Sequence, residues 1–536
     1  MIGALTVPAR QRWAVLLCGV LAAPAAPLLA TPVARAEPIT LQLVQVNDVY
    51  EITPLPGGGG DLAQVAGLVR QLRRRQPNTL VLLAGDALSP SALGTAQVGG
   101  QRLDGRQMVA VLNALGLDAA TFGNHEFDLT EQSFRARLKD SRFAWISSNV
   151  SGADGQPFPG VARDRLIELR GPAGARLRLG LLGITLSSNP APYVRYGDPL
   201  ATATAQAQGL RRRGADVVVA LTHQALAADQ QLADSGAPID LILGGHEHEN
   251  VLQLRLRTPA SASIAADQPP SAGATPGCRP AGVPIAKADA NARTVVLHTL
   301  RFDPRSRCLA IRSDLLPIDG RWPIEPQVRR EAERWQALGN AAFRRQGLQP
   351  ERVVATSPVP LDGRSASVRN GPTALTQLLG QALRAAVPGS DLAILNSGAI
   401  RIDDVLPPGP IRELDVVRVL PFGGRLQRIG IQGQLLQRVL EAGLANRGNG
   451  GFLVLDGAER DGAGRWRIAG QPLNPERRYS AAIADFLLTG RETGLGFLTP
   501  TAAGLELLGD GGDLRQAVIS WLAQGPWGQP LPRKSR

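Results

Sequence analysis

LQLVQVND at residues 41–48, DLAQVAGLVRQLRRR at 61–75 and TLVLLAGD at 79–86 are three consecutive segments of this 536-residue sequence. The first and third are apolar runs of strand length that end in an aspartate. The second repeats apolar residues at the three- and four-residue spacing of an amphipathic helix. This alternation continues to about residue 320, and it predicts an α/β domain.

Short polar motifs directly follow five of the apolar runs. They are Asn47-Asp48-Val49-Tyr50, Gly85-Asp86, Gly123-Asn124-His125-Glu126, Thr222-His223 and Gly244-Gly245-His246-Glu247-His248. The chain has only five histidines, and four of them lie in these motifs. In open α/β sheets the loops at the carboxyl ends of strands converge on a ligand crevice, so these side chains are expected to meet there. Carboxylates, imidazoles and an amide oxygen are ligands of divalent metals, which predicts a binuclear metal cluster with Asp86 as its best bridging candidate.

The first 36 residues predict a cleavable secretory signal peptide. Two arginines precede a mostly apolar stretch over 14–30, and Ala34-Arg35-Ala36 has the small-residue pattern of a cleavage site. An uncleaved membrane anchor is the alternative, but the apolar stretch contains two prolines and is shorter than the ~20 residues that span a bilayer. We therefore expect a periplasmic or secreted protein with no stable membrane insertion after signal cleavage.

The formal net charge of +12 is spread along the chain. The arginine runs at 73–75 and 211–213 are interpreted mainly as solvated faces, with attraction of anionic substrates as a secondary effect. No aromatic-interleaved basic motif accompanies them, so no nucleic acid polymer is expected as a partner. Cys278 and Cys308 lie beyond the leader, and an exported compartment would let them pair. A disulfide and two unpaired thiols both remain open.

The chain is long enough for two large domains. The first domain is predicted over 37–322. The charged segment EPQVRREAERWQALGNAAFRRQ predicts an interdomain helix over 323–347, and a second α/β block follows over 348–536.

Taken in order, the five motifs resemble those of the calcineurin-like metallophosphoesterases, and specifically the secreted 5'-nucleotidase family, over nearly the whole mature chain. The resemblance implies a four-layer α/β/β/α sandwich followed by an α/β substrate-binding domain. It also implies two divalent metal ions of zinc, manganese or cobalt type and hydrolysis by a metal-bound water.

The same resemblance implies roles for individual residues. Asp86 would bridge the two metals, one of which would also be held by Asp48 and His248. The other metal would be held by Asn124, His223 and His246. His125 would face the phosphate, with Asp128 orienting its ring.

One position departs from the family pattern. The family usually has histidine as the last residue of a D-x-H motif, whereas this chain has Tyr50. Phenolate can bind a hard trivalent ion, but neutral tyrosine is a poor ligand for zinc or manganese. Three alternatives follow: Tyr50 binds metal, water takes its place, or the site is weakened.

In the second domain the resemblance implies nucleotide contacts by arginines, an asparagine and two aromatic rings. The matching residues are Arg369, Asn396, Arg401, Phe422 and Phe486. The two rings would sandwich the base, and such stacking is worth roughly 1 to 3 kcal/mol per base. Family runs near 372–377 and 490–494 are altered here, which leaves the base and ribose contacts open.

The function predicted from these residues is hydrolysis of nucleoside 5'-monophosphates to nucleosides and phosphate. Within the same enzyme family, the alternatives are hydrolysis of cyclic nucleotides, nucleotide sugars or sulfur esters. A different class of alternative is a nucleotide-binding relative with weakened catalysis, suggested by Tyr50 and the altered loops.

Overall fold

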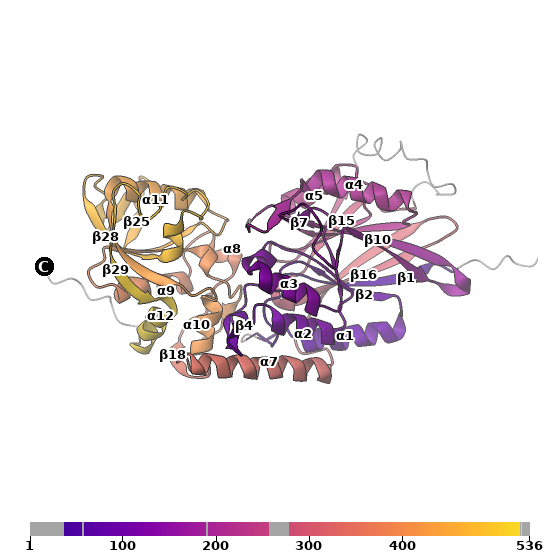
Figure 1. Cartoon of the computed structure of the whole chain (residues 1–536), viewed down its shortest axis with the longest axis horizontal. Helices are drawn as coiled ribbons and strands as arrows, with labels where there is room; N and C mark the ends of the chain where they lie inside the picture. The colour runs from indigo at the N-terminus through magenta and orange to yellow at the C-terminus, as the bar shows by residue number, and fades with distance from the viewer. Residues whose placement is uncertain (1–36, 56–57, 189–190, 257–277, 526, 528–536) are drawn as a thin grey trace, which may run out of the picture.

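Two α/β units joined by one long helix make up the fold (Figure 1). The computed structural model describes residues 37–55, 58–188, 191–256, 278–525 and 527. The predicted signal peptide, 1–36, lies outside the described residues.

The first domain contains two large mixed sheets. The first sheet has the strand order β17 (Leu309–Pro317), β16 (Thr294–Phe302), β1 (Ile39–Val46), β2 (Thr79–Ala84), β5 (Ala119–Thr121), β6 (Ala144–Ile146) and β8 (Val161–Ala162). The second has the order β14 (Val251–Leu256), β15 (Gly282–Lys287), β13 (Leu241–Gly244), β12 (Val217–His223), β10 (Arg176–Thr185) and β9 (Asp164–Arg170). Strands β1, β2, β5 and β6 are parallel, as are β10, β12, β13 and β15.

The alternation of side chains along β1 explains the layers. Leu41 and Leu43 lie in the core between the two sheets, whereas Val44 and Val46 lie in the core beneath the helices. Successive strand residues point to opposite faces, so a strand that is apolar on both faces must be covered on both. The result is the α/β/β/α sandwich that the sequence predicted.

Helices cover both outer faces of the sandwich. On the first sheet they are α1 (Leu62–Arg75), α2 (Arg106–Leu115) and α3 (Glu131–Asp140); on the second they are α4 (Pro199–Arg212) and α5 (Leu226–Asp234). Two small antiparallel sheets pair β3 (Gln97–Val98) with β4 (Gln101–Arg102), and β7 (Val150–Gly152) with β11 (Val194–Tyr196). Asp61 caps α1 by accepting a hydrogen bond from the Ala63 amide at 2.9 Å.

The two arginine runs are only partly solvated faces. Arg73 forms an ion pair with Asp118 at 2.7 Å, and Arg211 pairs with Asp240 at 2.5 Å. The Asp240 side chain is only 5% exposed, so Arg211 neutralises a buried carboxylate at the start of a strand. The interpretation as solvated faces was wrong for these two residues, because sequence spacing does not show which carboxylate packs beneath an arginine.

The long helix α7 (Pro326–Arg345) lies along the lower edge of the molecule in Figure 1 and packs against α1 and α2. It falls within the segment predicted as the interdomain helix. A direct contact between the domains comes from Arg418, whose Nε donates to Glu51 Oε1 at 3.0 Å.

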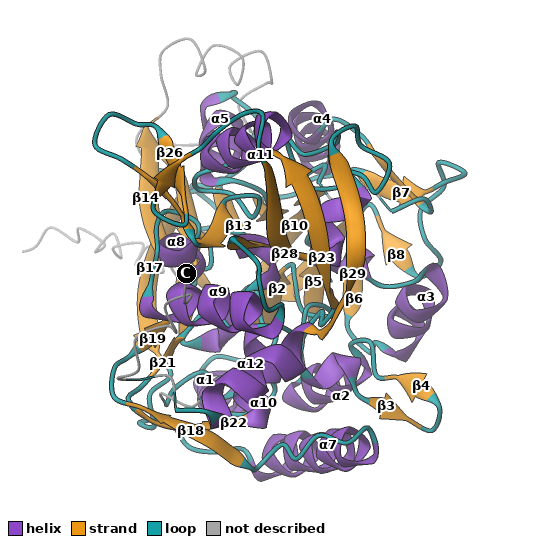
Figure 2. Ribbon diagram, turned by 90° about the vertical axis from the view of Figure 1, so that its left-hand side faces the viewer, coloured by secondary structure: helices purple, strands orange, loops and turns teal. Residues whose placement is uncertain are grey.

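The second domain is built on one mixed sheet with flanking helices (Figure 2). Its strand order is β24 (Leu453–Asp456), β20 (Leu392–Asn396), β28 (Arg478–Ala484), β23 (Arg425–Gln432) and β29 (Leu505–Asp513). The helices are α8 (Ser365–Val368), α9 (Ala374–Ala386), α10 (Glu413–Val419), α11 (Gly433–Ala445) and α12 (Leu514–Ala523). Short strands complete it: β18 (Val353–Ser357), β19 (Leu361–Asp362), β21 (Val405–Leu406), β22 (Gly409–Arg412), β25 (Ala458–Arg460), β26 (Trp466–Ile468) and β27 (Gln471–Pro472).

Cys278 and Cys308 form a disulfide in the structure. Of the two alternatives that the sequence left open, the structure contains the bonded one. The bond ties the segment before β15 to the residue that precedes β17.

Candidate active site

The five polar motifs meet at one edge of the sandwich. Asp48 follows β1, Asp86 follows β2, and His223 is the last residue of β12. One oxygen or nitrogen from each of these three buried side chains lies within 4.8 Å of the others. The two sheets are joined at this edge by His223, whose Nδ1 lies 2.8 Å from the Ala84 carbonyl oxygen.

Asp86 lies at the centre of the cluster. Its Oδ2 is 3.2 Å from His223 Nε2, and its Oδ1 accepts the His125 amide at 2.9 Å. Burial raises the pKa of Asp86, but the charges of His223 and His125 outweigh it and hold the pKa well below its usual range. The carboxylate is therefore ionised, which is the state that binds cations.

His246 and His248 both approach Asp48. The His246 amide donates to Asp48 Oδ2 at 2.9 Å, and the His246 ring is 5.4 Å from that of His223. His248 Nε2 is 3.2 Å from Asp48 Oδ1. Asn124 is buried immediately before the short helix η2 (His125–Asp128). The structure thus brings all six predicted metal ligands to one edge of the fold.

Backbone conformation marks the same residues. Asp48, Asp86, His246 and His248 have φ values of 53°, 57°, 89° and 64°. Non-glycine residues rarely adopt this left-handed region, and it costs of order 1–3 kcal/mol at each position. Such strain persists where the surrounding structure requires it, and here it turns four polar side chains toward one point.

Tyr50 extends into the middle of this cluster. Its hydroxyl is 3.3 Å from Asp48 Oδ1, 3.1 Å from Asp86 Oδ2 and 3.1 Å from His248 Nε2. The residue is 3% exposed, and its amide donates to Asn291 Oδ1 at 2.9 Å. The residue that departs from the family pattern therefore touches three candidate ligands.

His125 and Asp128 form a pair next to the cluster. His125 Nδ1 lies 2.8 Å from Asp128 Oδ2, which also accepts the Ser89 hydroxyl at 3.0 Å. The other ring nitrogen, Nε2, is 3.0 Å from Nη2 of Arg401. A carboxylate on one nitrogen fixes the ring and leaves the other nitrogen facing the second domain.

The second domain also reaches the metal-ligand candidates through Asp403. Its Oδ2 is 2.6 Å from His248 Nδ1, and its Oδ1 accepts the Ser365 amide at 2.6 Å. Burial lowers the pKa of His248, but Asp403 and Asp48 raise it to about 10. Sequence reasoning missed Asp403, although it lies only two residues after Arg401.

The two predicted aromatic rings are exposed at one end of the large sheet in the second domain. Phe422 is 47% and Phe486 is 39% exposed. Phe422 precedes β23 and Phe486 follows β28, and these strands are antiparallel with Leu426 opposite Ala484. That pairing places both rings at the same edge. The high exposure is unlike that of core phenylalanines.

The remaining predicted substrate contacts are Arg401, Arg369 and Asn396. The Arg401 guanidinium is 5.7 Å from the centroid of the Phe422 ring. Burial and neighbouring Arg401 lower the pKa of Arg369 to about 10. Asn396 Nδ2 donates to Glu492 Oε2 at 2.8 Å, so the altered loop at 490–494 contacts a residue predicted to bind the substrate.

Glu126 is a further site residue that sequence reasoning did not single out. It is fully buried and accepts backbone N–H groups of Asp86, Ala87, Leu88 and Gly123 at 2.6–3.2 Å. Burial and the charge of Asp86 raise its pKa to about 7. Its carboxylate holds the loops after β2 and β5 together. Its position directly after His125 in the sequence was the signal that could have identified it.

Lys287 performs a similar task behind the loops after β12 and β13. It is fully buried, donates to the carbonyl oxygens of Gln224 and Gly245 at 2.7 Å, and pairs with Asp229 at 2.9 Å and with Glu247. A single lysine at the end of the apolar strand GVPIAK was the signal that could have identified it.

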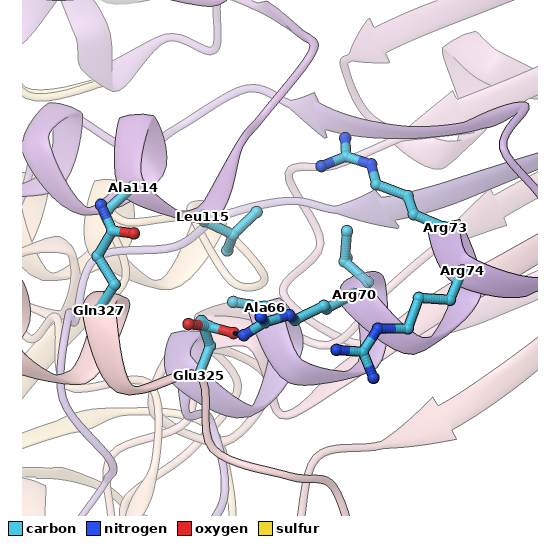
Figure 3. Close-up of a pocket in the computed structure, with 9 residues that line it drawn as sticks. Ala66, Arg70, Arg73, Arg74, Ala114, Leu115, Glu325 and Gln327 are labelled. Carbon is cyan, nitrogen blue, oxygen red and sulfur yellow. Dashed lines mark hydrogen bonds and ion pairs between the residues drawn. The ribbon is translucent and has the colours of Figure 1, made fainter.

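A depression of about 550 Å³ lies elsewhere, between α1, α2 and the start of α7 (Figure 3). An ion pair between Arg70 and Glu325 crosses it. Its lining contains none of the predicted site residues. The candidate active site is therefore distinct from this depression.

Comparison with known proteins agrees with the geometry. Residues 41–250 match the family described as calcineurin-like phosphoesterase, and residues 353–497 match the 5'-nucleotidase C-terminal domain. Human 5'-nucleotidase is 25% identical over an alignment of 417 residues that covers 74% of this chain and 69% of that protein.

Two solved structures show the same fold. A 5'-nucleotidase precursor from Thermus thermophilus superposes with a TM-score of 0.74 at 24% identity, over 90% of this chain and 96% of that one. The sulfate thiohydrolase SoxB from the same organism gives 0.65 at 17% identity, over 90% and 94%. With both domains matched in order along the sequence, the chain belongs to the 5'-nucleotidase family and is a phosphoric ester hydrolase.

Proposed function

We propose that this chain hydrolyses nucleoside 5'-monophosphates to nucleosides and phosphate. One observation carries the proposal: the Arg401 side chain lies between His125, beside the carboxylate cluster, and the exposed ring of Phe422. Its Nη2 is 3.0 Å from His125 Nε2 beside the carboxylate cluster, and its guanidinium is 5.7 Å from the exposed Phe422 ring. A ligand that touches all three groups carries a phosphate at one end and a planar ring at the other.

The cluster fits a pair of cations. His223 Nε2 is buried and makes no hydrogen bond among the described residues, although a carboxylate oxygen lies 3.2 Å away. We assign Asp48, Asp86 and His248 to one cation, and Asp86, Asn124, His223 and His246 to the other. When bound, divalent cations of this kind polarise a phosphoryl group and lower the pKa of water.

His125, Asp128 and Arg401 would act on the phosphate itself. Asp128 orients the His125 ring through Nδ1. In the structure Nε2 accepts a hydrogen bond from Arg401. Once the phosphate takes this Arg401 donor, Nε2 is free to carry a proton and to pass it to the leaving ester oxygen. The fork of N–H donors on Arg401 matches the oxygens of the phosphate, which gains charge during the reaction.

Phe422 and Phe486 are expected to hold the base. Changing either to alanine removes roughly 1–3 kcal/mol of stacking, and this raises KM for AMP about 5- to 150-fold. KM for a small aryl phosphate should stay unchanged because that substrate does not reach both rings. Steady-state kinetics on the two substrates measure the difference.

Leu508 on β29 offers a matched control, since it is 45% exposed in the same domain. Leu508→Ala should leave both KM values unchanged. Equal losses on AMP and the aryl phosphate in the phenylalanine variants would mean that the rings are structural.

Asp403 is expected to support the cation on the Asp48 side by fixing His248 through its Nδ1. Carboxylates in this position typically change metal affinity by about 10- to 100-fold. Asp403→Asn should therefore weaken one of two metal-binding events by that factor, as titration calorimetry can measure. Asp404→Asn is the control, because Asp404 accepts the Val405 amide at 2.8 Å and lies 3.8 Å from Arg293. Unchanged affinity in Asp403→Asn would remove the assigned role.

We also propose that the protein is exported. The predicted leader and the Cys278–Cys308 disulfide support this, because disulfides persist in oxidising compartments. Within the described residues, no helix is long and apolar enough to cross a membrane.

The proposed reaction is tested by phosphate release from AMP, UDP-glucose, a cyclic nucleotide and an aryl phosphate. Residues 37–536 would be assayed with and without added Mn²⁺, Zn²⁺ or Co²⁺, and after loading with Fe(III) and Zn(II). Metal-dependent release that favours AMP supports the 5'-nucleotidase. Preference for another ester would assign one of the related hydrolases, and no release with any metal would favour a nucleotide-binding relative.

A further inference from the structure

Tyr50 occupies a place that ordinary packing does not explain. A buried tyrosine usually directs its hydroxyl to one or two hydrogen-bond partners, often backbone carbonyls. Here the three contacts of the hydroxyl are with Asp48, Asp86 and His248, each at 3.1–3.3 Å. These are the side chains assigned above to one cation.

The distances among three of these groups are those of ligands around a common metal. Tyr50 Oη, Asp48 Oδ1 and His248 Nε2 are separated from one another by 3.3, 3.1 and 3.2 Å. Neighbouring ligands with bonds of about 2.0–2.2 Å are about 2.8–3.6 Å apart, over the range from octahedral to tetrahedral geometry. The hydroxyl therefore lies where a ligand of the cation assigned to Asp48, Asp86 and His248 would lie.

The chemistry of the two halves of the cluster differs. On the Asp48 side the donors are two carboxylates, one phenol and one imidazole. The other side adds two imidazoles and an amide to the shared Asp86. Charged oxygen donors favour hard cations of high charge, whereas imidazoles suit borderline divalent ions.

We propose that Tyr50 binds the cation on the Asp48 side as a phenolate and that this position takes ferric iron next to a divalent ion. The inference deepens the proposed function by naming the metal of that site. On binding, the phenol O–H bond breaks, an O–Fe bond forms and the proton leaves to solvent. The oxidation state of the iron does not change.

The test is optical and does not require turnover. The mature chain is stripped with a chelator, loaded with Fe(III) and Zn(II), and its metal content and visible spectrum are recorded. A phenolate bound to ferric iron produces a broad charge-transfer absorption in the visible region, so the iron-loaded protein should be coloured. Tyr50→Phe should lose this absorption completely.

The chain has only four tyrosines, which makes the controls simple. Tyr479→Phe is the matched control, because Tyr479 is also buried and its hydroxyl accepts the Asn474 amide at 2.8 Å within the second domain. It should retain the absorption. Tyr50→His should be colourless with iron and should bind Mn²⁺ or Zn²⁺ more tightly than the unchanged chain.

Three results would overturn the inference: an unchanged chain that retains no iron, an iron-loaded chain without visible absorption, and absorption that survives in Tyr50→Phe. Failure of the proposed function has a different signature. In that case the coloured protein releases no phosphate from AMP, and the assignment of Tyr50 stands.

Discussion

Asp86→Ala is expected to empty both cation positions and to lower kcat/KM for AMP on the order of 10⁴-fold. The reason is geometric: Asp86 Oδ2 faces His223 Nε2 at 3.2 Å and the Tyr50 hydroxyl at 3.1 Å, so it belongs to both halves of the cluster. Bound cations supply several kcal/mol of transition-state stabilisation, and each 1.36 kcal/mol is a factor of ten in rate. Metal analysis together with phosphate release measures the two effects.

Asp61→Ala is the matched control for a buried aspartate. Asp61 is 2% exposed, caps α1 and pairs with Arg329, outside the cluster. Its loss should cost about 1 kcal/mol of stability or more while both metals remain bound. Two metals per chain in folded Asp86→Ala would refute the bridging role.

His125→Ala is expected to leave the metal content nearly intact and to lower turnover by about 10² to 10⁴, the usual contribution of a general acid. The side chain is positioned by Asp128 at 2.8 Å and faces Arg401 at 3.0 Å, and only its backbone amide contacts Asp86. The ring can therefore be removed without removing a predicted metal ligand. Metal analysis and kcat for AMP are the measurements.

The choice of substrate separates catalysis from general damage to the site. AMP has a poor leaving group that needs a proton, whereas p-nitrophenyl phosphate releases a stable anion. His125→Ala should therefore impair AMP hydrolysis far more than p-nitrophenyl phosphate hydrolysis. Asp128→Asn should show the same pattern more weakly, because it disturbs only the orientation of the ring. If His125→Ala also loses its metals, the acid role is wrong.

Local sequence determined the first domain and the positions of its polar motifs. Apolar runs such as LQLVQV and TLVLLA are buried on both faces, which demands a covered parallel sheet and places Asp48 and Asp86 at one edge. The motif order then predicted the family, and the comparisons confirmed it. Roles of the individual site residues stay predictions until the variants are measured.

Only the tertiary structure decided what supports those motifs. Asp403 of the second domain forms an ion pair with His248 of the first, and Glu126 accepts hydrogen bonds from four backbone amides in two loops. Lys287 was visible as a charge at the end of an apolar strand, but its partners were not. Each of these charged groups is buried and therefore requires hydrogen-bond or ion-pair partners. Which partners it has depends on how the strands and domains pack.

Tyr50 shows most clearly which properties the sequence determines and which the tertiary structure decides. The sequence identified the substitution and left three alternatives for it, because the chemistry of a phenol depends on what surrounds it. The structure placed its hydroxyl within 3.3 Å of two carboxylates and an imidazole that come from three different strand ends. Residue type follows from the sequence alone, whereas the distances that turn a residue into a ligand arise only when the sheets pack.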